Sequence, residues 1–129
     1  MKELGDPSFV FVVDDDSSFR RSTELLIRAA GLDAQGFGSA EEFLRSHRPD
    51  VPSCLILDVR LPHLSGLDLQ RQLFKTDEQI PIIFISARAT DQERTEAIAG
   101  GAVDFLCKPF REDALFNALQ VALTQRNSG

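Results

Sequence analysis

Short apolar segments alternate with longer amphipathic segments along this chain. Segments such as FVFVV and CLILD are almost continuously apolar, which is typical of strands that are covered on both faces of a sheet. We predict strands at residues 9–13, 33–37, 54–58, 81–86 and 103–107, and five helices at residues 17–30, from 39, from 65, at 90–99 and at 111–125. This alternation indicates an α/β domain whose five-stranded parallel sheet is doubly wound, with helices on both faces.

The starts of the predicted helices carry capping signals. Ser39 with Glu42 three residues later is typical of a capping box, in which a hydroxyl and a carboxylate accept backbone N–H groups. Thr90 with Glu93 shows the same pattern. The helix that begins near residue 65 is expected to turn three side chains inward: Leu69, Leu73 and Phe74.

Length and composition are those of one globular domain. The chain has 129 residues, of which 43% are hydrophobic and 26% charged, enough to bury a continuous core. We expect a single domain over residues 1–129, with residues 1–8 as an N-terminal extension and residues 126–129 as a tail or the start of a linker.

The charge of the domain restricts its partners and its location. The formal net charge is −6, so the domain as a whole repels nucleic acid and anionic membranes. No apolar run approaches the roughly 18 residues needed to span a membrane, and the first residues, MKELGDPSF, lack an apolar signal-peptide region. We therefore expect a cytoplasmic location, without direct binding to nucleic acid or membrane.

The cysteines and histidines do not suggest a zinc site or a disulfide. Cys54 and Cys107 lie in apolar surroundings and are expected to be buried free thiols. His47 and His63 have no Cys or His neighbour at ligand spacing, so we expect solvated loop or helix-end residues.

Polar residues collect where the predicted strands end. They are Asp14, Asp15 and Asp16 after the first strand, Asp58 after the third, Ser86 after the fourth, and Lys108 with Pro109 after the fifth. Because the carboxyl ends of parallel strands lie side by side, these residues are expected to form one cluster. The three aspartates alone have two readings: a polar turn in which Asp16 or Ser17 caps the next helix, or a set of ligands for Mg²⁺.

This set of residues resembles the receiver domain of bacterial two-component response regulators. The resemblance covers nearly the whole chain and rests on VVDDD, LDVRLPHLSG, FISA and KPF, each at a predicted strand end and in the family's order. The sequences SAEEFL, SGLDLQ and GAVDFLCKPF most resemble those of the FixJ/NarL-type regulators. The resemblance implies a flavodoxin-like sheet with strand order 2-1-3-4-5.

The resemblance also implies a role for the residues at the strand ends. Asp58 would accept a phosphoryl group from a sensor histidine kinase, a reaction in which the domain takes part without being an enzyme. Mg²⁺ would be held directly by Asp15, Asp58 and the backbone carbonyl of Arg60, with Asp14 acting mainly through water, and Lys108 would pair with phosphate oxygens. The family's Lys-Pro peptide bond is typically cis, and for Lys108 alone the alternative is a solvated loop lysine.

Ser86 and Phe105 match the switch positions of the family. The Ser86 hydroxyl would turn toward the phosphoryl group, and Phe105 would fill the space it leaves. For Phe105 the alternative is an ordinary core aromatic. Two arginines, Arg60 and Arg88, match positions that tune phosphate lifetime and kinase choice; they would attract anionic phosphodonors, and their alternative is solvated surface arginine.

Other functions fit the sequence less well. A phosphatase of the haloacid dehalogenase type would need a second acid two residues after Asp58, where this chain has Arg60. The stretch GFGSAE lacks the third glycine of a dinucleotide site and follows the wrong strand, and there is no GxxxxGK[ST]. The serious alternative is a receiver-like interaction module that works without phosphorylation.

The downstream effect of the domain follows only from the resemblance. The resemblance implies a helix-turn-helix DNA-binding domain outside residues 1–129, homodimerisation on phosphorylation, and control of transcription. The face built from the fourth helix, the fifth strand and the fifth helix would be remodelled.

Overall fold

Five parallel strands form one twisted sheet. The computed structural model describes residues 8–128, and its strands are β1 (Phe9–Val13), β2 (Asp33–Phe37), β3 (Ser53–Asp58), β4 (Ile82–Ser86) and β5 (Asp104–Cys107). Their order is β2-β1-β3-β4-β5, and every neighbouring pair is parallel. The predicted fold class and strand order are confirmed, and β2 lies at an edge as expected.

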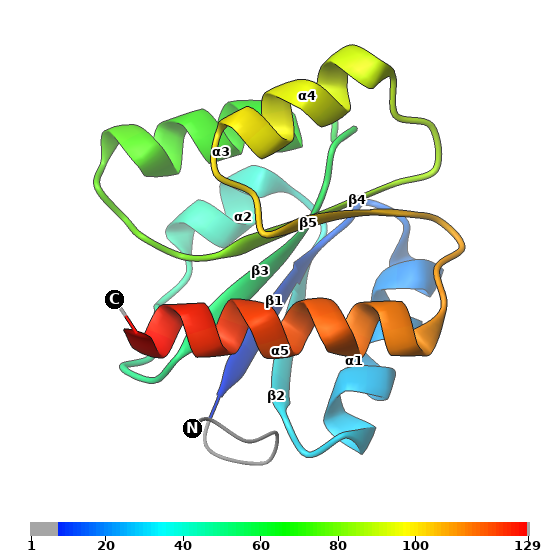
Figure 1. Cartoon of the computed structure of the whole chain (residues 1–129), viewed down its shortest axis with the longest axis vertical. Coiled ribbons are helices and arrows are strands. Elements are labelled where there is room, and N and C mark those ends of the chain that lie inside the picture. Colours follow the sequence, from blue (N-terminus) through cyan, green and yellow to red (C-terminus); the bar gives the residue numbers. More distant parts are fainter. Residues whose placement is uncertain (1–7, 129) are drawn as a thin grey trace.

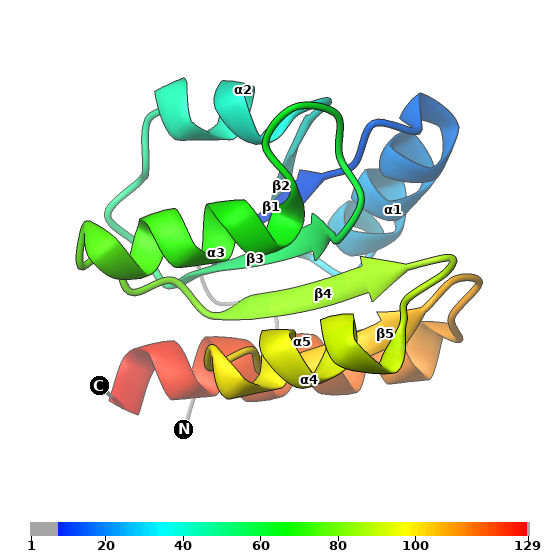
Figure 2. The ribbon, with the colours of Figure 1, turned by 90° about the horizontal axis from the view of Figure 1, so that it is seen from above.

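Helices cover both faces of the sheet. They are α1 (Ser17–Ala29), α2 (Ala40–Arg45), α3 (Gly66–Lys75), α4 (Asp91–Ala99) and α5 (Glu112–Ser128). Figures 1 and 2 show α1 and α5 on one face and α2, α3 and α4 on the other. The buried side chains form two clusters accordingly, because alternate residues of each strand point to opposite faces.

Hydrogen bonds at the helix starts agree with most of the predicted caps. Thr90 and Glu93 form a complete capping box at α4. The Ser39 hydroxyl accepts the N–H of Glu42, but the Glu42 carboxylate accepts the N–H of Gly38 instead of that of Ser39. The predicted box at α2 is therefore only half formed, since its carboxylate reaches one residue further back.

Three expectations about single positions are wrong. Phe74 is 82% exposed, because it follows Leu73 on α3 and points away from the sheet that buries Leu73. Cys107 is exposed because it ends the short edge strand β5, whereas Cys54 is buried as expected and both are free thiols. The last helix reaches Ser128, beyond the predicted end at residue 125.

Other expectations concern the chain ends and the surface. Residues 1–7 of the predicted extension and residue 129 of the predicted tail lie outside the described residues. His47 and His63 are both exposed, as expected. Among residues 8–128, none of the helices combines the length and hydrophobicity that a bilayer span requires.

Candidate functional site

The three consecutive aspartates after β1 differ in burial and in their hydrogen bonds. Asp14 is fully buried, and its Oδ1 accepts the N–H of Asp16 at 2.9 Å. Asp15 is exposed. Asp16 is the N-cap of α1, and its Oδ1 accepts the N–H groups of Ser18 and Phe19 at 3.0 and 3.2 Å. The two readings of this stretch therefore concern different residues: Asp16 caps the helix, and the metal reading rests on Asp14 and Asp15.

Asp58 ends β3 at the same edge of the sheet. It is 6% exposed, and its Oδ1 accepts the N–H of Arg60 at 3.0 Å. The following loop returns closely over this backbone, since Gly66 donates to Val59 O at 3.0 Å. A Cβ at position 66 would clash with the carbonyl oxygen of Asp58, so the loop needs glycine there for its close approach.

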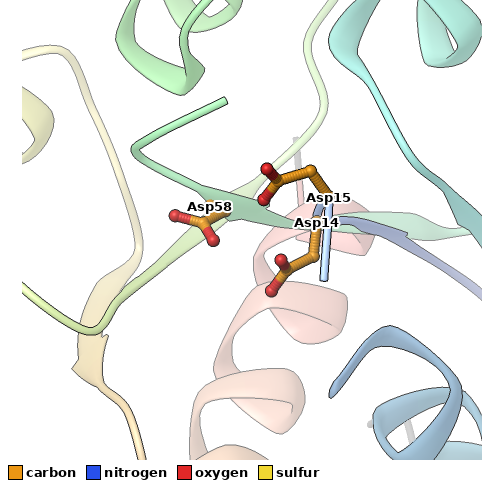
Figure 3. A group of neighbouring side chains, drawn as sticks. All are labelled: Asp14, Asp15 and Asp58. Carbon is orange, nitrogen blue, oxygen red and sulfur yellow. The ribbon is translucent and has the colours of Figure 1, made fainter. Parts of the chain in front are cut away.

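Asp14, Asp15 and Asp58 converge on one point. One carboxylate oxygen from each lies within 4.8 Å of the other two, and Figure 3 shows the three side chains gathered at the ends of β1 and β3. Asp14 is fully buried, and its Oδ2 faces the ammonium group of Lys108. A hard divalent cation fits this set, because carboxylate oxygens are its preferred ligands and three of them converge here.

Lys108 is the cation that these carboxylates contact in the structure. Its Nζ lies 2.7 Å from Asp14 Oδ2 and 3.0 Å from Asp58 Oδ2. The Lys108 N–H donates to Ser86 O at 2.8 Å, and the peptide bond between Lys108 and Pro109 is cis. The ammonium group therefore bridges the ends of β1 and β3 from its position after β5.

Burial and neighbouring charges shift the pKa values of Asp58 and Lys108. Burial raises the pKa of Asp58 above its usual value; the hydrogen bonds from Arg60 and Lys108 offset part of this rise, and the charge of Asp14 adds to it. Burial acts to lower the pKa of Lys108, but its contacts with Asp14 and Asp58 outweigh burial and raise it. Lys108 is therefore a firmly protonated cation near neutral pH.

Of the two predicted switch residues, Ser86 lies beside this cluster and Phe105 lies on the neighbouring strand β5. Ser86 is 1% exposed, and its hydroxyl accepts the N–H of Arg88 at 3.1 Å. Phe105 is 6% exposed and stacks on Phe84, with ring centroids 6.0 Å apart. The guanidinium carbon of Arg94 lies 4.8 Å from the centroid of the Phe105 ring. Phe105 is thus packed inward beneath an arginine of α4.

The two arginines at the opening differ in their contacts. Arg60 Nε donates to Arg88 O at 3.1 Å, and Arg60 Nη2 lies 2.9 Å from Glu93 Oε1. The side chain of Arg60 is 55% exposed. Arg88 is exposed, and its backbone makes hydrogen bonds with Ser86 and Arg60.

Sequence reasoning missed three residues around this cluster. Phe19 lies beneath the lysine, with Lys108 Nζ 4.3 Å from its ring centroid, and packs edge-on against Phe110. Glu93 pairs with Arg60, and Arg94 covers Phe105. Helical spacing placed these residues on α1 and α4, but no local pattern linked them to strand ends far away in the sequence.

The chain is similar to known proteins over most of its length. The family model of the response regulator receiver domain matches residues 10–120. Nodulation protein W of Bradyrhizobium diazoefficiens is 52% identical over 125 residues, which are 97% of this chain and 55% of that protein. The transcriptional regulatory protein TdiR of Thauera aromatica is 42% identical over 121 residues, which are 94% of this chain and 53% of that protein.

Solved structures show the same relationship. The crystal structure of FixJ-N has a TM-score of 0.83 and 33% identity, and the match covers 96% of both chains. This neighbour agrees with the predicted likeness to FixJ-type regulators. The chain spans about half the length of the curated relatives it matches. Since the family match covers residues 10–120 and these relatives align over almost the entire chain, the chain belongs to the receiver domains of two-component response regulators.

Proposed function

We propose that this receiver domain is a phosphorylation-activated switch whose phosphoacceptor is Asp58. The observation that carries the proposal is the convergence of Asp58 with two further carboxylates and the ammonium group of Lys108. Isolated, such a group of like charges would be costly. A reaction in which these carboxylates hold a cation next to an anionic phosphoryl group would account for three carboxylates at one edge of the sheet.

In the proposed reaction a carboxylate oxygen of Asp58 attacks the phosphorus of a phosphohistidine on a sensor kinase. The bond between phosphorus and the imidazole nitrogen breaks, and the acyl phosphate forms on Asp58. Asp14, Asp15, Asp58 and the backbone carbonyl of Arg60 are the groups that would hold Mg²⁺, which when bound neutralises phosphoryl oxygens. After the transfer, the Lys108 ammonium would pair with the phosphoryl oxygens in place of the Asp58 carboxylate.

The response would run through Ser86 and Phe105. A phosphoryl group on Asp58 offers the Ser86 hydroxyl a new acceptor at the same edge of the sheet. Movement of Ser86 changes the space beside Phe105, whose ring is already packed inward on Phe84. The surface made by α4, β5 and α5 would change with it and favour homodimerisation.

The output of the switch is proposed from the relatives. TdiR is by its name a transcriptional regulator, and this chain covers about half of it. We propose that a DNA-binding output domain lies outside residues 1–129 and that the protein acts in the cytoplasm on transcription. The net charge of −6 on the receiver domain fits a division of labour in which another domain contacts DNA.

Intact mass tests the acceptor directly. The wild type and Asp58→Asn are incubated with acetyl phosphate and Mg²⁺, and we expect a gain of one phosphoryl group in the wild type alone. No gain in a folded wild type that binds Mg²⁺ would contradict the proposal and favour a module that switches without phosphate.

Magnesium binding is tested by thermal unfolding with a matched pair of variants. Saturating Mg²⁺ should stabilise the wild type, by about 2.7 kcal/mol at a hundredfold excess over Kd. Asp15→Asn should abolish this gain. Asp16→Asn is the control, because it removes the same charge one residue later while asparagine can still cap α1. Equal losses in both variants would argue against a specific site.

A further inference from the structure

A chain of hydrogen bonds connects the phosphoacceptor to the start of α4. The backbone N–H of Arg60 donates to Asp58 Oδ1 at 3.0 Å, and its side chain reaches Arg88 O at 3.1 Å and Glu93 Oε1 at 2.9 Å. The backbone N–H of Arg88 in turn donates to Ser86 Oγ at 3.1 Å. One arginine side chain therefore links Asp58, the loop after Ser86 and the first turn of α4.

The two members of the ion pair are not equally fixed. Glu93 Oε1 also accepts the N–H of Thr90 at 2.9 Å, and the N–H of Glu93 donates to Thr90 Oγ1 at 3.0 Å. The Glu93 side chain is thus held by the capping box and is 23% exposed, whereas that of Arg60 is 55% exposed. Arg60 is the partner that can leave, and Glu93 is the fixed anchor.

We propose that Glu93 is a positioning residue: its carboxylate holds the Arg60 guanidinium against α4. The guanidinium is then less available to bind an anionic phosphodonor beside Asp58. This inference rests on the proposed phosphorylation of Asp58. Arg60 is two residues from Asp58, and an incoming phosphodonor is an anion that competes with the Glu93 carboxylate for the same guanidinium. Phosphorylation and the ion pair therefore oppose each other, and α4 senses the charge at Asp58 through the loss of this pair.

The competition predicts opposite effects for the two partners. Glu93→Gln keeps a carbonyl oxygen that can accept the Thr90 N–H, but it releases the guanidinium. With acetyl phosphate as donor, this variant should be phosphorylated about two- to fivefold faster, the range that an exposed ion pair can bias. Arg60→Gln should be slower than the wild type by a similar factor, since the guanidinium is gone. In the double variant the rate should equal that of Arg60→Gln.

A second ion pair on α4 supplies the matched control. Arg71 Nη1 of α3 lies 3.8 Å from Glu96 Oε2, three residues after Glu93 on the same helix. Glu96→Gln removes the same charge from α4 without touching Arg60. Its phosphorylation rate should match that of the wild type, so that a general change of charge on α4 is separated from release of Arg60.

The experiment measures phosphorylation rates of all five proteins by intact mass over a range of acetyl phosphate concentrations, at low and high salt. We expect the gain in Glu93→Gln to lie in the apparent affinity for the donor and to shrink at high salt. Equal rates in Glu93→Gln and the wild type, a shift of both partners in the same direction, or the same gain in Glu96→Gln would each overturn this inference alone. A wild type that takes up no phosphoryl group would overturn the proposed function and this inference together.

Discussion

Helices α4 and α5 flank the same edge strand, β5, but are held in the molecule by different forces. Within residues 112–124 of α5, the buried side chains are Leu115, Ala118, Leu119, Ala122 and Leu123, and they pack in one continuous cluster on the sheet. In α4 the only buried side chain is Ala97, and Ile98 is 49% exposed. Figure 1 shows α4 above and α5 below the part of the sheet where β5 lies.

Polar contacts replace apolar burial at α4. Gln70 of α3 is buried and donates to Ala97 O at 3.0 Å, Arg60 pairs with Glu93, and Arg71 pairs with Glu96. Apolar packing is insensitive to charge, whereas these contacts respond to charge and salt. The difference teaches that α4 is the element of low local stability next to the site, and so the one that a charge change at Asp58 can shift.

The strongest test of the comparison removes one anchor of α5. Leu119→Ala should lower the free energy of unfolding by about 2–5 kcal/mol, because a fully buried side chain is lost and a cavity is left. Urea denaturation measures this change. Val121→Ala, on the exposed side of the same helix, is the control and should cost far less. Similar losses in both variants would contradict the assignment of α5 as an apolar anchor.

At α4 the corresponding change is the loss of one hydrogen bond. Gln70→Ala should cost about 1–1.5 kcal/mol and should speed hydrogen exchange in α4 more than in α5. Gln72→Ala is the control, since Gln72 is an exposed residue of the same helix α3. If exchange accelerates equally in α4 and α5, then α4 is not an independent unit and the comparison fails.

The charge at Asp58 should itself cost stability. Because burial raises the pKa of Asp58 above that of the unfolded chain, the folded protein binds this proton more tightly, and ionisation near neutral pH destabilises the fold. Asp58→Asn should therefore be more stable than the wild type near pH 7, by on the order of 1 kcal/mol. The advantage should disappear as the pH falls through the raised pKa, where the wild type takes up the proton. Thermal unfolding across pH measures this, and an advantage that persists unchanged at low pH would argue against the ionised carboxylate as its cause.

Salt should produce the smallest effect and the most selective one. About 1 M NaCl screens exposed ion pairs, so the local opening free energy of α4 should fall by about 0.2–0.5 kcal/mol relative to that of α5. Hydrogen exchange at low and high salt gives both values. In the variant Arg60→Gln the salt effect on α4 should be smaller, because one of its ion pairs is already missing.

Much of the fold could be predicted because it depends on local pattern. Apolar runs predicted β1, β3, β4 and β5, the more polar segment at 33–37 predicted an edge strand, and the alternation with helices predicted the parallel sheet. Hydroxyl residues before helices predicted the caps at Ser39 and Thr90. Phe74 shows the limit of the pattern: it is apolar and next to Leu73, but the turn of the helix points only one of the two inward.

The sequence by itself determined which groups meet at the carboxyl edge of the sheet, because parallel strands bring their ends together whatever the details of packing. Only the tertiary structure decided how those groups divide their roles. It separates Asp16, the cap of α1, from Asp14 and Asp15, and it places the Lys108 ammonium between Asp14 and Asp58. The physical reason is that such contacts depend on side-chain conformations in elements far apart along the chain, which local periodicity does not encode. The pairing of Arg60 with Glu93, 33 positions apart, is set in the same way, by the docking of α4 beside the loop after β3.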